Sequence, residues 1–298
     1  AVSIALMNTL FRLATLVVLF PLIGAMERLV VFLFPDTGLI AEEQDMDRLE
    51  ERFLQHPALS IEQSRLVTNS MAERAAGNLL DAMALRTNYS EKALQNVEET
   101  ESLIDRYEDK LGTYLMKIPS RSLSATQSEE VSKYLHTISD FERISDHAVN
   151  LLAASEELRS KGLGFSAAAE KELKVLIGAV SEILNTAERA FSEKDLAAAA
   201  QVEPLKQVIV ALKEQMRTRH ILRMQQGHCS IEAGFVWSDL LTDLERTADH
   251  CSNIAGCVLD AANHGLNLHE TLRAMRADDP DFRRAYGTYA EKYRLQAA

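Results

Sequence analysis

The amino-acid sequence predicts an all-α protein, and three observations lead to that fold class. Glycine and proline are scarce, with 12 and 6 copies in 298 residues, while the strong helix formers Ala, Leu, Glu and Arg are abundant. Apolar residues recur at spacings of three and four along the chain, which places them on one buried stripe of a helix. A polar motif occurs twice and indicates two tandem copies of one three-helix unit.

The first element, residues 1–34, is almost wholly apolar, with only Arg12, Glu27 and Arg28 charged. Its uncharged part is shorter than the ~20 residues that cross a bilayer, but the flanking charged side chains can snorkel and extend it. We expect a membrane-spanning or partly re-entrant helix followed by an amphipathic interfacial stretch, ahead of both bundles. A buried core helix of a soluble protein is the alternative. Because residue 1 is not Met, we also expect the chain to start within a longer protein.

An acidic connector, residues 35–58, leads from this segment into the helical part. Breaks at 88–90, 119–120, 162–164, 192 and 227 divide the rest of the chain into about six helices. Ser60 with Gln63, and Ser124 with Gln127, have the spacing of capping boxes and predict two helix starts. The expected organisation is a first three-helix repeat over 59–162, a second over 163–265, and a C-terminal tail over 266–298.

The repeated motif reads SDFERISDHAVN at 139–150 and TDLERTADHCSN at 242–253. The two copies share six residues, all of them polar. Core packing would preserve apolar character and let the polar positions drift, so the match indicates a common chemical or structural role. The shared pairs are Asp140 and Asp243, Glu142 and Glu245, Arg143 and Arg246, Asp146 and Asp249, His147 and His250, and Asn150 and Asn253.

Helical spacing places part of each motif copy in a row. Residues four apart lie one above the other on a helix, so each copy offers a stripe of oxygen ligands. If the third and sixth helices pack face to face, four carboxylates converge. The two rows are Glu142, Asp146 and Asn150, and Glu245, Asp249 and Asn253.

Carboxylates one turn apart repel each other, so the duplicated row calls for a compensating positive charge. Arg143 and Arg246 can supply it, and so can a bound cation such as Mg²⁺, Mn²⁺ or Fe, because hard cations suit all-carboxylate sites. A solvated face whose acids pair with arginine is the alternative interpretation.

Several other functions are disfavoured by the composition. A net charge of -12 argues against nucleic-acid binding, which needs clustered Lys and Arg. No Glu has a His three residues later, which argues against a di-iron carboxylate oxidase, and we expect no enzymatic activity. We expect His147 and His250 to make structural hydrogen bonds. The expected packing residues are Cys251, Cys257, Trp237 and Phe235.

The segments ERISDHAVN and ERTADHCSN resemble the E(R/K)xxDHxxN signature of the PhoU family, and the resemblance covers about residues 59–264. It implies two tandem PhoU-like three-helix bundles that bind a divalent or iron-type metal (Fe, Mn, Mg or Zn). A V-x3-E-x2-ID pattern typical of PhoU second helices fits the first repeat, whereas the second repeat departs from it and does not imply an equivalent full cluster. The implied ligands are Glu142, Asp146, Glu245 and Asp249, with Glu101 and Asp105 from the second-helix pattern. In the second repeat Lys206 stands at the Glu position of that pattern and Val210 at its Asp position.

The N-terminal part, NTLFRLATLVVLFPLIGAMERLVVFLFPD followed by LEERFLQHPALSIEQSRL, resembles the junction in bacterial sodium/phosphate cotransporters where the last membrane helix meets a PhoU-like tail. The closing FRRAYGTYAEKYRL resembles the end of the same family. The Gln-Ser-Ser-Ser motifs of that family's transport site do not occur in this sequence, so the chain would not transport by itself.

The cotransporter resemblance implies a regulatory domain of a sodium-dependent phosphate cotransporter, acting in phosphate transport and homeostasis. Its partner would be its own transporter membrane domain, through which sodium and phosphate pass, and homo-oligomers are compatible with this role. The implied location is the bacterial inner membrane, with residues 35–298 in the cytoplasm. The alternative is a free-standing PhoU-type phosphate-signalling adaptor with an N-terminal membrane anchor.

Overall fold

The computed structural model describes residues 7–8, 11–12, 15, 45–86, 89–119, 123–262 and 280–296. The chain divides into two compact units, Ala1–Asp47 and Arg48–Ala298. In the first unit the few described positions are helical. The long helices all belong to the second unit.

The expected membrane or interfacial segment, residues 1–34, lies almost wholly outside the described residues. Among the helices that the structure describes, none combines the length and the apolar character needed to cross a bilayer. The prediction of an inner-membrane location is corrected on this finding, because no helix that the structure describes can serve as its membrane span.

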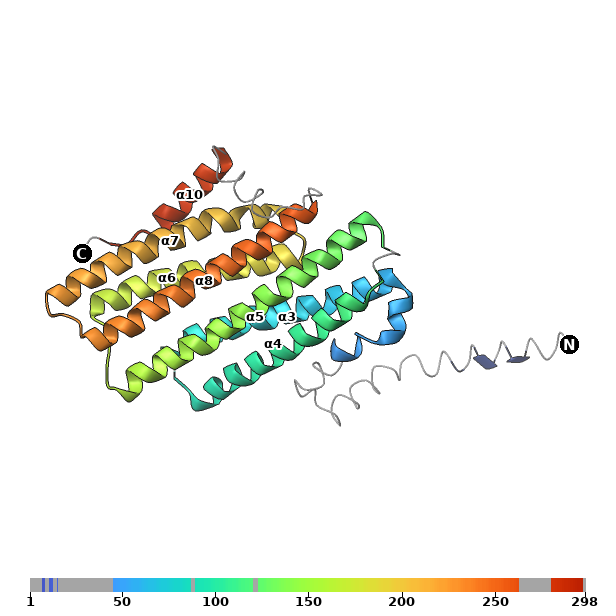
Figure 1. Ribbon diagram of the computed structural model, residues 1–298, viewed down its shortest axis with the longest axis horizontal. Helices are drawn as coiled ribbons and strands as arrows, with labels where there is room; N and C mark the ends of the chain where they lie inside the picture. The colour runs from blue at the N-terminus through green and yellow to red at the C-terminus, as the bar shows by residue number, and fades with distance from the viewer. Residues whose placement is uncertain are drawn as a thin grey trace. The chain divides into compact units, whose positions relative to one another are not determined.

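Every regular element in the described ranges of the second unit is a helix, and none is a strand, which confirms the all-α fold class. A short 3₁₀ helix, η1 (Glu51–Gln55), precedes the bundles, and α10 (Pro280–Lys292) follows them (Figure 1). The six long helices between them are α3 (Pro57–Leu85), α4 (Glu91–Lys117), α5 (Ala125–Ser160), α6 (Ala167–Ser192), α7 (Leu196–Gln225) and α8 (Ile231–Ala262).

These helices form two three-helix bundles. The helices α3, α4 and α5 pack against one another, and so do α6, α7 and α8. Extensive packing of α5 on α8, with a smaller contact between α3 and α6, joins the bundles side by side (Figure 1). The tandem arrangement is thus confirmed, while the exact repeat boundaries 59–162 and 163–265 stay predictions.

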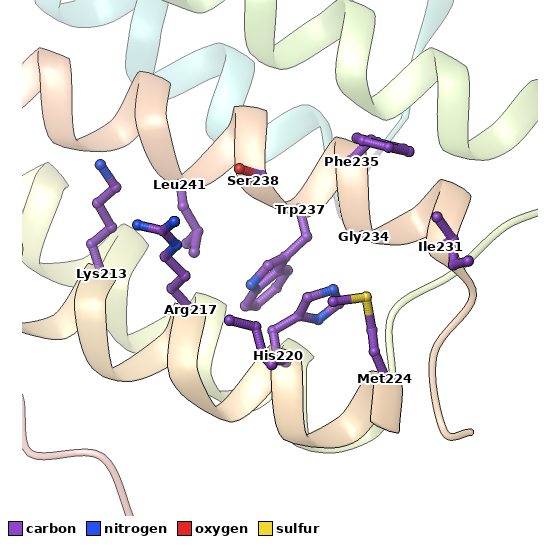
Figure 2. A pocket seen from close by; sticks show the side chains of 11 residues that line it. Lys213, Arg217, His220, Met224, Ile231, Gly234, Phe235, Trp237, Ser238 and Leu241 are labelled. Atoms are coloured by element: carbon purple, nitrogen blue, oxygen red, sulfur yellow. The ribbon is translucent and has the colours of Figure 1, made fainter. Parts of the chain in front are cut away.

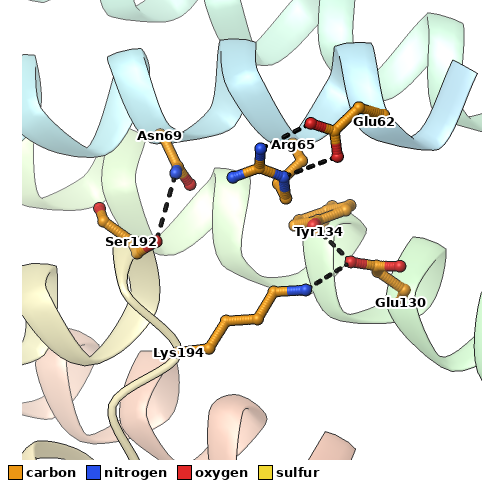
Figure 3. Close-up of polar contacts among 7 residues, drawn as sticks. All are labelled: Glu62, Arg65, Asn69, Glu130, Tyr134, Ser192 and Lys194. Carbon is orange, nitrogen blue, oxygen red and sulfur yellow. Dashed lines mark hydrogen bonds and ion pairs between the residues drawn. The ribbon is translucent and has the colours of Figure 1, made fainter. Parts of the chain in front are cut away.

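Polar contacts hold the turn between α6 and α7 against the first bundle (Figure 3). In that turn, the Lys194 Nζ atom lies 3.1 Å from a Glu130 carboxylate oxygen on α5, and the same oxygen accepts the Tyr134 hydroxyl at 2.9 Å. The Asn69 side chain of α3 donates to the Ser192 carbonyl at 3.5 Å. The end of α6 is therefore tied to both α3 and α5.

The two expected capping boxes have different outcomes. At the start of α5, the Ser124 hydroxyl accepts the Gln127 backbone N–H at 3.2 Å, and the Gln127 side chain accepts the Ser124 N–H at 3.0 Å. The cap expected at Ser60 is wrong, because α3 already begins at Pro57, whose fixed φ and missing N–H suit a first helical turn. Ser60 is buried inside that helix, and its hydroxyl donates to the Phe53 carbonyl at 2.7 Å.

Regularly spaced buried side chains fix how each helix is rotated. On α4, Val97, Ile104 and Leu111 are fully buried at seven-residue intervals. Since Ile104 faces the core, Glu101 and Asp105 are held at the edge of the contact with α5. The hydrophobic stripe therefore sets where the acidic side chains of this helix project.

Four residues were expected to pack inside the protein. Cys251, Cys257 and Trp237 are buried, as predicted. Phe235 is 68% exposed, so its assignment to the core is wrong. Side chains two residues apart on a helix are rotated by about 200° around its axis. Because Trp237 points inward, Phe235 must face outward.

Candidate metal site in the first bundle

Three carboxylates meet where α4 faces α5. Glu101 and Asp105 come from α4 and Asp146 from α5, and one carboxylate oxygen of each lies within 4.8 Å of the others. Glu101 and Asp146 are half-buried, and Asp105 is exposed. The structure thus brings together three of the six residues expected to bind metal. We call these three carboxylates, together with Glu142, the acidic seam.

Electrostatics in the acidic seam are unfavourable to negative charge. Burial, with repulsion from Asp146 and Glu108, raises the pKa of Glu142 to about 7. Burial and the neighbouring Asp105 charge raise the pKa of Glu101, and burial with Asp146 raises the pKa of Asp105. The group therefore holds more negative charge than its surroundings stabilise, which is the condition that a bound cation relieves.

The motif arginines compensate the negative charge of the two acidic rows only weakly. The Arg143 Nε atom lies 3.5 Å from a Glu142 carboxylate oxygen, but its side chain is largely in solvent. Arg246, its counterpart, is also exposed. Exposed ion pairs contribute little, typically about 0–1 kcal/mol, so neither arginine neutralises a row.

The equivalent place in the second bundle has a different chemistry. On α7, Lys206 bonds Asp249 with an Nζ–Oδ1 distance of 2.8 Å, and Lys213 forms a close ion pair with Glu245. Both lysine side chains are largely buried. The expected ligands Glu245 and Asp249 therefore face ammonium groups. These four residues are called the lysine seam.

Lys213 is the functional residue that sequence reasoning missed. The alignment that sets Lys206 against Glu101 also sets Lys213 against Glu108, two turns further along the helix. Continuing the register by seven residues would have revealed it. Two of the acids that α4 turns toward α5 are thus replaced by lysine on α7.

The remaining polar residues of the motif join the two bundles. Each copy contributes an Asp that binds the His and Asn of the other copy, and the two His rings lie 5.6 Å apart. We call this arrangement the reciprocal clasp. Its contacts are His147 Nδ1 to Asp243 Oδ1 at 3.1 Å, His250 Nδ1 to Asp140 Oδ1 at 2.8 Å, Asn150 to Asp243 at 3.5 Å, and Asn253 to Asp140 at 3.1 Å.

The reciprocal clasp corrects the expected convergence of four carboxylates. The helices α5 and α8 do pack face to face, but their contact is made by the clasp, and the acidic rows turn toward α4 and α7 instead. Asn150 and Asn253 belong to the clasp, away from the rows. The expectation that His147 and His250 make structural hydrogen bonds is confirmed.

Comparison with known proteins places this geometry in context. A family model described as PhoU domain matches residues 68–154 and 173–258, which is more than half of the chain. The chain is 26% identical over 201 residues to the phosphate-specific transport system accessory protein PhoU homolog 1 of Thermotoga maritima, covering 67% of this chain and 85% of that protein.

Two solved structures share the fold. PhoU from Pseudomonas aeruginosa aligns with a TM-score of 0.62 at 20% identity, over 70% of this chain and 99% of that one. The phosphate transport system regulatory protein PhoU from Streptococcus pneumoniae aligns with a TM-score of 0.58 at 16% identity, over 70% of this chain and 96% of that one.

Proposed function

Because this chain belongs to the PhoU domain family, we propose that it is a regulatory accessory protein of a phosphate transport system and has no catalytic role. The observation that carries this proposal is the family match to both halves of the chain, each with its own copy of the polar motif. The Thermotoga relative is named as an accessory protein, and the Streptococcus structure as a regulatory protein, of such a system.

These relatives favour an accessory protein over the regulatory tail of a sodium-dependent phosphate cotransporter. Each of them is a PhoU protein, and their similarity covers 67% to 70% of this chain. Sodium coupling and a transporter membrane domain as part of the same protein find no support in the matched region. The partner in this proposal is a component of a phosphate transport system, bound by the helical surface.

Within this function, the acidic seam is proposed to hold a divalent or iron-type cation. The residues fit such an ion, because three carboxylate oxygens from two helices lie within mutual reach and burial already raises the pKa of two of those acids. Oxygen-only donors suit Mg²⁺ and Mn²⁺ better than Zn²⁺, and iron is also compatible. The bound ion would brace α4 against α5. The lysine seam needs no ion, since its carboxylates are already paired.

Deleting the gene in its source bacterium tests the regulatory role. Phosphate uptake, measured with radiolabelled phosphate at low and high external concentration, should lose its normal dependence on supply and recover when the gene is restored. Unchanged uptake at both concentrations would reject the proposed function.

Metal content tests the acidic seam separately. Purified protein should retain about one ion per chain by elemental analysis. Asp146→Asn should lose this ion, whereas the matched Asp249→Asn in the lysine seam should keep it. Equal metal content in the two variants would reject the site without affecting the regulatory role.

A further inference from the structure

A cavity of about 280 Å³ lies between α7 and α8, close to the turn that joins them (Figure 2). Most of its wall is aromatic or aliphatic, and the two helices enclose it from facing sides. It lies apart from the acidic seam and the reciprocal clasp, and Lys213 of the lysine seam borders it. Its lining includes Arg217, His220, Met224, Gly234, Trp237 and Ser238.

Two buried rings in this cavity have unsatisfied polar atoms. His220 is 4% exposed and Trp237 1% exposed, and their rings stack with centroids 5.6 Å apart. In the described part of the protein, neither ring nitrogen of His220 nor Nε1 of Trp237 has a hydrogen-bond partner. A buried polar atom left unpaired costs about 1–3 kcal/mol, so these atoms indicate a partner that the helices do not provide.

The protonation state of His220 defines what that partner must offer. Burial, together with the nearby Arg223 charge, lowers the pKa of His220. A neutral imidazole presents one N–H donor and one nitrogen acceptor, and Trp237 adds a second donor. The floor of the cavity can therefore offer two hydrogen-bond donors to a ligand group that accepts them.

One end of the cavity is cationic. The Arg217 side chain is 66% exposed, and its pair with Glu214 is loose, at 4.0 Å. Figure 2 shows Arg217 from α7 and Ser238 from α8 on this side, with Met224 and Ile231 at the opposite end. In a chain of net charge -12, a cation beside an apolar cavity favours an anionic ligand.

The opposite end can be reshaped. A Cβ atom on Gly234 would lie 3.0 Å from Met224 Sδ and 3.1 Å from His220 Nε2, so glycine makes room for both side chains. Met224 is unbranched and flexible, and it can move aside to expose the His220 nitrogen. Exposed Ile231 and Phe235 add apolar area at this end of the cavity.

We propose that this cavity binds a small organic anion with an apolar body, of the class of aromatic or branched aliphatic carboxylates. The carboxylate would pair with Arg217 and accept hydrogen bonds from Trp237 Nε1 and the N–H of His220, while the apolar body packs against the Trp237 ring and Met224. The volume of about 280 Å³ lies just below the range of about 300–1,000 Å³ for ligand pockets, which limits the ligand to one ring or a short chain. The unpaired polar atoms at the base of the cavity suit such a molecule better than the apolar side of a partner helix.

Trp237 is the single tryptophan of the chain, so its fluorescence reports directly on this cavity. With 4-phenylbutanoate as the probe, we expect a saturable change in Trp237 emission with a Kd on the order of 0.1 mM. The neutral analogue 4-phenylbutan-1-ol should bind at least about tenfold more weakly, because it lacks the charge that pairs with Arg217. Inorganic phosphate, which lacks an apolar body, should give no saturable change.

Matched variants separate the contribution of the Arg217 charge from that of the cavity's shape. Arg217→Gln should weaken 4-phenylbutanoate at least about tenfold and leave the alcohol unchanged. Arg189→Gln, at a 54% exposed arginine of α6 outside the cavity, should change neither. Gly234→Ala should weaken both probes, and circular dichroism checks that each variant is folded.

Two results would overturn the proposal. One is the absence of any saturable Trp237 response to 4-phenylbutanoate in the unmodified protein. The other is equal affinity for acid and alcohol with no effect of Arg217→Gln, which would assign the cavity to an uncharged apolar group such as a partner's side chain.

Discussion

The acidic seam between α4 and α5 and the lysine seam between α7 and α8 carry the same motif acids on α5 and α8. They differ in the helix that faces those acids. Glu101 and Asp105 face the first pair, while Lys206 bonds Asp249 and Lys213 bonds Glu245 in the second. The motif alone therefore does not define a metal site, because the partner helix decides whether the acids need a cation.

In energetic terms, the lysine seam has its counter-ion built into the chain. The Lys206 ammonium stands 2.8 Å from Asp249, the separation of a charge-assisted hydrogen bond. The acidic seam instead accumulates like charges, as the raised pKa of Glu142 shows. The acids of one bundle are paired as folded, and the other bundle is the one in which we propose a dissociable ion.

The strongest challenge to this comparison is to convert the lysine seam into an acidic one with Lys206→Glu, Val210→Asp and Lys213→Glu. The change removes two ion pairs and adds repulsion, so the metal-free protein should lose about 3–5 kcal/mol of unfolding free energy. Mn²⁺ should restore much of this loss. Urea unfolding with and without Mn²⁺ measures both effects.

The control for this conversion is Lys206→Met with Lys213→Met, which removes the positive charges without adding acids. It should be destabilised without gaining a response to Mn²⁺ beyond that of the unmodified protein. If the triple variant were as stable as the unmodified chain in the absence of metal, the lysines would not be acting as counter-ions.

A second prediction concerns the unmodified acidic seam. An ion that binds only the folded state stabilises it by about 2.7 kcal/mol at a hundredfold excess over its Kd, which corresponds to a Tm increase of several degrees. Asp146→Asn should abolish the increase, and Asp249→Asn should preserve it. Thermal melts of the three proteins with Mn²⁺ measure these changes, and similar increases in all three would mean that the ion binds elsewhere.

The reciprocal clasp permits a comparison of the two motif copies themselves. Asp140 accepts bonds of 2.8 and 3.1 Å, whereas those to Asp243 measure 3.1 and 3.5 Å. We expect Asp140→Ala to cost about 2 kcal/mol and Asp243→Ala about 1 kcal/mol, because shorter bonds to a charged acceptor are stronger. Denaturant midpoints give the difference, and a larger cost at Asp243 would contradict this ranking.

The smallest expected effect is the pH dependence of the acidic seam. Folding raises the pKa of Glu142 from 4.5 to about 7, so between these values the folded state binds a proton that the unfolded state releases. Stability should therefore fall as pH rises from about 5 to 7, by about 1 kcal/mol, since water screens the partly exposed side chain. Glu142→Gln should flatten this profile in metal-free protein. A profile that stays equally steep would assign the titration to another group.

Much of the fold could be predicted from the sequence, because helix propensity, helix breaks and repeats can be recognised in short segments. Scarce Gly and Pro, helix breaks and the repeated motif are properties of single segments, and they predict six helices in two bundles. Spacing also places Glu142 and Asp146 one turn apart. It does not specify which neighbouring helix they face, because that depends on how the bundles are rotated against each other. The convergence of four carboxylates was wrong for this reason.

The cavity illustrates the same limit. Its wall comes from residues of α7 and α8 that lie on either side of a turn, and their meeting depends on how those helices cross. Two features of the sequence nevertheless indicate parts of this geometry. Trp237 and Phe235 cannot both face inward from one helix, and Lys213 continues the register of Lys206.

The reciprocal clasp has a consequence for how a protein of this kind can arise. Each motif copy carries both halves of the contact, the accepting Asp and the donating His and Asn, so the pattern is self-complementary. That is the property of an isologous interface, in which one surface patch binds an identical patch after a twofold rotation. A single three-helix unit with these residues could pair with its own copy. Joining two such units in one chain makes the pairing intramolecular, and each half is then free to diverge, as α4 and α7 have done.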